Sequence, residues 1–322
     1  MPVKTPVKPF KPPDVEPLPA GLLTPRWWPA WFSLGLLWLL TLLPIPLLQA
    51  LGAGLGELFG LLVPSRRRIV RINLRLCFPK LDDAARRKLA RRHFRALGMG
   101  IFETLLAWFA SDRRLQRLVD FEGVEHLRAA QADGGGVLLL TGHFTTMEMG
   151  CRVMRLAGLP YHGMYRPADN PFVEYWMRRL REAKLGSSMV PKEDLKQVVR
   201  LLRRGANIWY APDQALDVAN ALHVDFFGQP TLTLTATSRL AQMGRARIVP
   251  YFPQRIGSWF GWRYRIVFRT AFEAFPSGDD AADARRVNAC LEDAIRAVPE
   301  QYFWVHRRFK DGPPGREDPY AK

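Results

Sequence analysis

The sequence predicts an α/β fold, in which a mixed, mostly parallel sheet is flanked by helices and preceded by an N-terminal membrane-anchoring helix. Three observations lead to this prediction. Short apolar runs alternate with helical segments beyond residue 109. No charged residue lies between Arg26 and Glu57. The chain has 322 residues, of which 48% are apolar, so it is long enough to bury one large core or two modest ones.

The N-terminal part divides into a tail and an anchor. Residues 1–26 are rich in Pro and Lys and are predicted to be a disordered basic tail. Residues 27–62 are predicted to be the membrane anchor, because the charge-free stretch within them exceeds the ~20 residues that cross a bilayer. Pro44 and Pro46 break or kink a helix. Two alternatives therefore stay open: the anchor spans once with a kink, or it enters one leaflet and lies there.

A cluster of arginines follows the anchor in "SRRRIVRINLR", residues 65–75. Arginines beside an apolar segment are typical of the cytoplasmic side and of anionic headgroups. Lysines on the other flank make this orientation signal mixed, and we place the main domain in the cytoplasm. Residues 63–312 are predicted to form that domain, and residues 313–322 a tail.

The main domain is predicted to contain a long helix at 82–109, capped by Asp82 or Asp83. The basic first half of this helix either forms an ordinary surface or contacts headgroups. Alternating elements follow, with strands at 136–142, 161–166, 207–212, 246–253 and 264–272, and helices at 145–157, 170–184, 192–205, 233–243 and 279–299.

The formal net charge of +17 limits the classes of partner. A basic surface draws nucleic acid, anionic lipid, phosphorylated substrates or an acidic carrier protein, and charge alone does not choose among them. Cys77, Cys151 and Cys290 show neither metal-site spacing nor an evident disulfide pair. No local motif marks any of the three as a nucleophile.

Candidate site residues follow the predicted strands, where sites form in open sheets. His143 and Glu148 stand in "LLLTGHFTTMEMG", at the turn after the first strand and in the helix beyond it. We expect the turn at Gly142 to fold His143 back over the helix, so that Glu148 accepts a hydrogen bond from its ring. The other ring nitrogen would then act as a base on a hydroxyl that attacks an acyl group. From spacing alone, the alternative is a strand-end histidine and a solvated glutamate.

Further motifs decide between these alternatives. The chain resembles the late acyltransferases of lipid A biosynthesis, the lauroyl/myristoyl transferase family, from about Trp27 to Lys310. The stretches that carry this resemblance are "NLRLCFP" (73–79), "ALGMGIFET" (96–104), "GHFTTMEMG" (142–150), "MYRPADNP" (164–171), "RRLREAK" (178–184), "WYAPDQ" (209–214) and "PEQYFWVHRRFK" (299–310).

The resemblance implies a glycerophosphate-acyltransferase-like fold and transfer of a fatty acyl chain from acyl carrier protein to a hydroxyl. That hydroxyl belongs to a 3-hydroxyacyl chain on a lipid A precursor. The resemblance also implies work at the cytoplasmic face of the inner membrane, with no metal or organic cofactor and no nucleic-acid partner. His143 and Glu148 fall on the catalytic pair of the family, and Arg179 and Asp213 on two further positions tied to activity.

The residues themselves leave other roles open. Arg166 is expected to bind a phosphate or the thioester, or else to pair with Asp169. Without the resemblance, Arg179 would belong to a solvated face, and Asp213 would orient an arginine or cap a helix. The loop at 211–231 departs from the family pattern because it lacks the usual Tyr-Gly, so the acyl length and the acceptor site stay open.

Two other functions compete with lipid A acylation as interpretations of the sequence. One is acylation of another glycolipid or phospholipid, which uses the same histidine–acid chemistry; the sequence shows no separate glycerophosphate-type motif. The other is a non-enzymatic, membrane-tethered binder of anionic lipid or nucleic acid. Such a binder predicts basic residues interleaved with exposed aromatics, whereas the arginines here are scattered over predicted helices.

Overall fold

The computed structural model describes residues 17–132, 134–185, 188–214, 221–258 and 261–321. Its centre is a seven-stranded sheet with the strand order β1-β9-β8-β2-β5-β3-β4. All neighbouring strands are parallel except β8 and β9. The predicted α/β class with a mixed, mostly parallel sheet is therefore confirmed. The strands are β1 (Val119–Glu122), β2 (Val137–Leu140), β3 (His162–Tyr165), β4 (Met189–Pro191), β5 (Asn207–Tyr210), β8 (Arg247–Ile256) and β9 (Arg263–Phe268).

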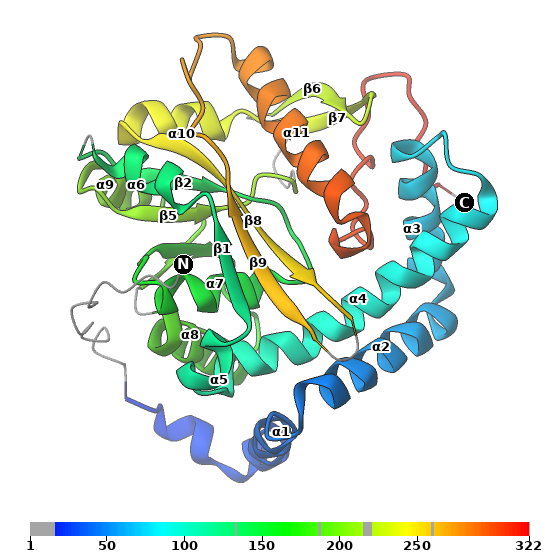
Figure 1. Cartoon of the computed structure of the whole chain (residues 1–322), viewed down its shortest axis with the longest axis vertical. Helices are drawn as coiled ribbons and strands as arrows, with labels where there is room; N and C mark the ends of the chain where they lie inside the picture. The colour runs from blue at the N-terminus through cyan, green and yellow to red at the C-terminus, as the bar shows by residue number, and fades with distance from the viewer. Residues whose placement is uncertain (1–16, 133, 186–187, 215–220, 259–260, 322) are drawn as a thin grey trace.

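Helices cover both faces of this sheet (Figure 1). The α-helices are α1 (Trp28–Leu40), α2 (Ile45–Leu62), α3 (Pro64–Cys77), α4 (Asp83–Phe109), α5 (Asp112–Gln116), α6 (Val124–Ala132), α7 (Met147–Leu156), α8 (Pro171–Leu185), α9 (Leu195–Arg203), α10 (Ala236–Gly244) and α11 (Asp280–Ala297).

The central strand β2 shows why two helical layers are needed. All four of its side chains are fully buried, as expected for a parallel strand covered on both faces. Leu138 and Leu140 belong to one apolar cluster, which includes side chains of α9, α10 and α11. Val137 and Leu139 belong to a second cluster, which includes side chains of α4, α6 and α7. The alternation of side chains along the strand thus divides the core into two halves.

The predicted anchor forms two helices, α1 and α2, which are separated by a turn just before Pro44. Within the described residues, α2 is the one helix that is long and apolar enough to cross a membrane by length and composition. Residues 20–23 and 25–27 form two 3₁₀ turns, η1 (Ala20–Leu23) and η2 (Pro25–Trp27). Residues 1–16 of the predicted disordered tail lie outside the described residues.

The helix α4 begins as predicted, because the Asp82 carboxylate accepts a hydrogen bond from the backbone N–H of Ala85 at 2.7 Å. The structure also contains a hairpin where the sequence predicted a loop followed by a helix from residue 233. It consists of β6 (Ala221–Phe226) and β7 (Gln229–Leu234), and α10 begins only after it. Phe227 and Gly228, in the two-residue turn, both have positive φ, as the tight turn requires.

The predicted tail at 313–322 lies against α3 where it is described. The Arg68 guanidinium donates a hydrogen bond to the Tyr320 carbonyl at 2.8 Å, and the Tyr320 side chain is buried. This contact fixes the C-terminal segment to the arginine-rich helix that follows the anchor.

Candidate active site

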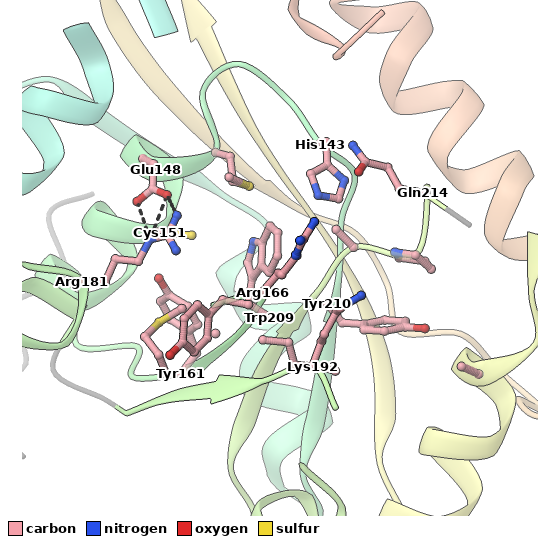
Figure 2. Close-up of a pocket in the computed structure, with 18 of the residues that line it drawn as sticks. His143, Glu148, Cys151, Tyr161, Arg166, Arg181, Lys192, Trp209, Tyr210 and Gln214 are labelled. Atoms are coloured by element: carbon pink, nitrogen blue, oxygen red, sulfur yellow. Dashed lines mark hydrogen bonds and ion pairs between the residues drawn. The ribbon is translucent and has the colours of Figure 1, made fainter. Parts of the chain in front are cut away.

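The carboxyl ends of β2, β3 and β5 open into one cavity of about 590 Å³. This position agrees with the general rule for open parallel sheets. His143 follows β2, Arg166 follows β3, and Gln214 follows β5; all three line the cavity (Figure 2). The wall is mostly apolar and includes several sulfur-containing and aromatic side chains: Met147, Cys151, Tyr161, Met164, Met189 and Trp209.

His143 is hydrogen-bonded to Asp213 twice. Its ring Nδ1 lies 2.6 Å from Asp213 Oδ1, and its backbone N–H donates to Asp213 Oδ2 at 2.8 Å. Adjacent strands bring the two residues together, because Leu140 pairs with Tyr210 at the ends of β2 and β5. Gly142 keeps the turn close, since a Cβ there would lie 3.3 Å from Asp213 Oδ2. The Asp213 side chain is buried, whereas 30% of the His143 side chain is exposed.

This contact shifts both groups toward their charged forms. Burial raises the pKa of Asp213, but the His143 charge and the hydrogen bonds from its ring and backbone outweigh burial and hold the pKa at about 2. Burial lowers the pKa of His143, but the Asp213 carboxylate more than compensates, so this pKa lies above the ordinary value of 6.5. Asp213 is thus ionised at neutral pH and holds a proton on Nδ1 of His143, which makes Nε2 the basic nitrogen.

The prediction that Glu148 accepts a hydrogen bond from the His143 ring is wrong, because that ring contacts Asp213 instead. Glu148 lies in the first turn of α7, where it accepts a hydrogen bond from Arg181 Nε at 3.0 Å and another from Trp108 Nε1 at 3.1 Å. Figure 2 shows this ion pair at a part of the cavity away from His143. The reason for the difference lies in the sheet, because β5 places Asp213 beside His143 whereas α7 directs Glu148 toward α8.

The arginines that line the cavity also differ from those predicted. Arg179 is not among the cavity-lining residues; it donates a hydrogen bond to the Tyr175 hydroxyl at 3.0 Å and lies over that ring. Arg181, two residues later in the same motif, lines the cavity and holds Glu148. Arg166 lines the cavity too, and its exposed side chain lies 3.6 Å from Asp169, so the alternative pairing is present as a solvated contact.

Three cavity residues were not among the predicted site residues. Arg181 is one; Lys192, after β4, and His306, in the C-terminal motif, line the cavity as well. Trp108 reaches Glu148 from α4. Burial lowers the pKa of His306, which keeps this second imidazole neutral. The density of aromatic and basic residues in "PEQYFWVHRRFK" was the available signal for His306.

The backbone after β2 is already engaged in hydrogen bonds. The N–H of His143 donates to Asp213, that of Phe144 to the Gly142 carbonyl, and that of Thr145 to the Gln301 carbonyl. These three groups are therefore not available to an oxyanion. Over the described ranges, no three His, Cys, Asp or Glu side chains gather in a way that would hold a metal ion.

Comparisons with known proteins show which family this chain is similar to. Residues 19–311 match the family model described as bacterial lipid A biosynthesis acyltransferase. The chain is 39% identical to the lipid A biosynthesis lauroyltransferase of Escherichia coli K12, over 92% of this chain and 95% of that protein. It is 35% identical to the palmitoleoyltransferase of the same strain, over 92% and 96%. It is 28% identical to the myristoyltransferase, over 92% of each.

Proposed function

The chain belongs to the bacterial lipid A biosynthesis acyltransferases, and from this membership we propose how its cavity performs the transfer. We propose that a fatty acyl chain moves from acyl carrier protein to the hydroxyl of a 3-hydroxyacyl chain on a lipid A precursor. The observation that carries this proposal is the His143–Asp213 pair at the edge of a mostly apolar cavity.

His143 acts as the general base in this mechanism. Its Nε2 takes the proton from the acceptor hydroxyl as the hydroxyl oxygen attacks the thioester carbonyl. Asp213 stabilises the imidazolium that forms and fixes the ring. When the tetrahedral intermediate collapses, the carbon–sulfur bond breaks and the imidazolium returns the proton to the departing thiolate. The products are the acyloxyacyl ester and the free thiol of the carrier.

Glu148 has a different role from the one predicted from spacing. Arg181 and Trp108 hold its carboxylate in the cavity wall, and it positions Arg181 rather than His143. We propose that the Glu148–Arg181 pair shapes the polar part of the substrate site. Arg166 and Lys192 add positive charge to the cavity wall, where they suit the phosphates of a lipid A precursor or of the carrier prosthetic group.

The surface charge and the apolar N-terminal helices support the proposed location at the cytoplasmic face of the inner membrane. The net charge of +17 favours encounter with an acidic carrier protein and with anionic headgroups. The acyl length is left open, since the three relatives named above carry the names of three different acyl groups.

A transfer assay with purified protein tests the proposed function. The protein is incubated with acyl carrier protein loaded with C12, C14, C16 or C16:1 chains and with a sugar-modified tetra-acyl lipid A precursor. We expect the precursor to gain the mass of one acyl chain, with one chain length preferred. Glycerol 3-phosphate serves as the competing acceptor. Acylation of glycerol 3-phosphate with none of the precursor would contradict the proposal.

The two neighbouring arginines of α8 give a matched pair of variants. We expect Arg181→Met to lower kcat/KM at least 10-fold, because it leaves the Glu148 carboxylate buried without its cation. We expect Arg179→Met to stay within about 3-fold of the wild type, since Arg179 contacts Tyr175 and does not line the cavity. Steady-state kinetics at fixed pH measure both. A larger loss of kcat/KM for Arg179→Met than for Arg181→Met would support the original prediction that Arg179 is the functional arginine.

A further inference from the structure

We propose that α1 and α2 lie along one leaflet of the membrane and that neither helix crosses it. This inference rests on the proposed membrane location and decides between the two alternatives that the proline-broken anchor leaves open. Its basis is the contrast between the two long faces of α2, one of which is apolar and exposed while the other is locked to the catalytic domain.

The outer face of α2 is a continuous leucine stripe. Its large exposed residues recur at helical spacings of three and four, so they share one side of the helix. Between 44% and 66% of each of these side chains is exposed: Leu47, Leu51, Leu55, Leu58 and Leu62. The helix α1 also exposes large apolar side chains and has no buried residue; the exposed ones include Trp28, Phe32, Leu36, Leu37, Trp38 and Leu39. Apolar surface of this extent marks an interaction site, because water does not favour its exposure.

The inner face of α2 is joined to α4 by glycines. A Cβ added at Gly56 would lie 1.9 Å from the Phe94 carbonyl oxygen, and one added at Gly52 would lie 2.8 Å from Met99 Cα. In turn, a Cβ at Gly98 of α4 would lie 2.0 Å from the Gly52 carbonyl oxygen. The two backbones are therefore in direct contact at Gly52 and Gly56, in the middle of α2, which is incompatible with a mobile tether.

Polar contacts fix α2 at both ends of this interface. Gln49, fully buried, donates to Glu103 of α4 at 2.9 Å and to the Tyr264 hydroxyl of β9 at 3.1 Å. Near the other end, Glu57 accepts hydrogen bonds from Arg91 at 3.1 and 3.0 Å. The helix is thus part of the catalytic domain, and it cannot leave without exposing glycine backbone and a buried carboxylate.

These attachments exclude an upright α2. A spanning α2 would carry its partner segment, residues 91–103 of α4, to the depth of the hydrocarbon. That segment bears Arg91 and Arg92, whose side chains are 70% and 55% exposed, and bringing such groups to membrane depth is costly. Strand β9 would also be drawn to this depth, because the Tyr264 hydroxyl is hydrogen-bonded to Gln49 of α2. If α2 lies flat, its leucine stripe is buried in lipid while Arg91 and Arg92 of α4 stay in water.

A lipid leaflet is the occupant that fits the whole surface. At the C-terminal end of α2 the chain turns directly into α3. Its Arg67, Arg71 and Arg75 line a shallow groove of about 550 Å³, and Arg71 and Arg75 are exposed. Guanidinium groups beside a leucine stripe match anionic headgroups beside acyl chains. A second copy of the chain would bury the leucines but would bring these arginines against one another.

The same placement brings the leaflet to the cavity. The ring of Trp31 in α1 packs edge-on against Trp176 of α8 at 5.3 Å between centroids. The next residue of α8, Met177, lines the cavity, and so does Arg181. Only α8 therefore lies between a lipid acceptor in the leaflet beside α1 and the cavity that contains His143. The acceptor can reach the cavity without leaving the membrane surface.

Depth-dependent fluorescence quenching tests this arrangement. The three native cysteines are replaced by alanine in the full chain, and the thermal transition is checked against that of the wild type. Single cysteines then replace Leu47, Leu55 and Leu62, and each carries a bimane label. The labelled proteins are bound to vesicles of phosphatidylethanolamine and phosphatidylglycerol that contain lipids with a nitroxide at carbon 5 or at carbon 12. A cysteine at Arg87, on the exposed side of α4, is the water-facing control.

We expect all three positions of α2 to be quenched more by the shallow nitroxide than by the deep one, with depths within ~5 Å of each other. A spanning helix would place position 55 about 10–12 Å deeper than positions 47 and 62, given a rise of 1.5 Å per residue. Strong quenching of position 55 by the deep nitroxide, with weaker quenching of the two ends, would overturn the proposal. So would an absence of quenching at all three positions in vesicle-bound protein, as expected for a self-associated leucine face.

The outcome is separable from that of the proposed function, because the transfer assay uses detergent-solubilised wild-type protein. Transfer without shallow quenching would leave the reaction intact and overturn only the flat placement. Shallow quenching without transfer would keep the placement and contradict the assignment of the reaction.

Discussion

Replacing His143 by alanine is expected to lower kcat on the order of 10²–10⁴-fold with little change in KM, because the acceptor hydroxyl loses the base that takes its proton. Acyl transfer from carrier-bound thioester, followed by mass spectrometry, measures the effect. His306→Ala is the control within the same cavity, since that imidazole lacks a carboxylate partner at hydrogen-bond distance among the contacts of the described residues. Equal activity of His143→Ala and wild type would remove His143 from the mechanism.

Asp213→Asn changes the pH profile as well as the rate. The neutral form of His143 is the active one, so activity falls as the pH drops through the pKa of this ring. In the wild type that pKa is raised above 6.5 by the Asp213 carboxylate, and the acid limb of kcat/KM is expected above pH 6.5. In Asp213→Asn the carboxylate is gone and burial alone acts, so the limb moves below pH 6.5 while the plateau rate falls.

The same pH profile separates the two acidic candidates. Glu148→Gln is expected to lower the rate without moving the acid limb, because Glu148 contacts Arg181 and Trp108 rather than His143. A shift of the limb in Glu148→Gln, with none in Asp213→Asn, would restore Glu148 as the partner of the base.

Two glycines of α2 are expected to respond differently to alanine. Gly56→Ala places a methyl group 1.9 Å from the Phe94 carbonyl oxygen, so α2 and α4 must move apart. Overpacking of this kind costs about 1–3 kcal/mol in the free energy of unfolding, and more where backbone is involved. Gly54→Ala meets nothing within 4 Å, and the higher helix propensity of alanine stabilises the helix by up to ~1 kcal/mol.

Thermal unfolding in one detergent measures both alanine variants. We expect the transition temperature to fall by several degrees for Gly56→Ala and to stay level or rise for Gly54→Ala. A matched, small change in the two variants would mean that the contact between α2 and α4 contributes little to stability.

The sequence predicted the parts of the fold whose signals are local. The structure confirms the buried strand β2, the capped start of α4 at Asp82 and the break between α1 and α2 at Pro44. The β6–β7 hairpin was missed because the turn at Phe227 and Gly228 lacks the Asn-Gly signature of such turns.

The site shows the limit of local reasoning more clearly. His143 and Asp213 were both singled out, yet their contact was not predicted, because it depends on which strand lies next to β2. Spacing favoured Glu148, five residues from His143, over Asp213, seventy residues away. The choice between Arg179 and Arg181 likewise depends on which face of α8 meets α7, and this was not evident from "RRLREAK".

The pairing of β2 with β5 therefore has a kinetic consequence. The proposed base and its carboxylate are seventy residues apart in the sequence, so they meet only after the parallel strands β2 and β5 have paired. Such non-local pairing is slow compared with helix formation. A refolding chain therefore regains the circular dichroism of its helices before His143 and Asp213 come into contact. Recovered enzymatic turnover is thus a late marker of folding, and it reports on the completed centre of the sheet rather than on the helices around it.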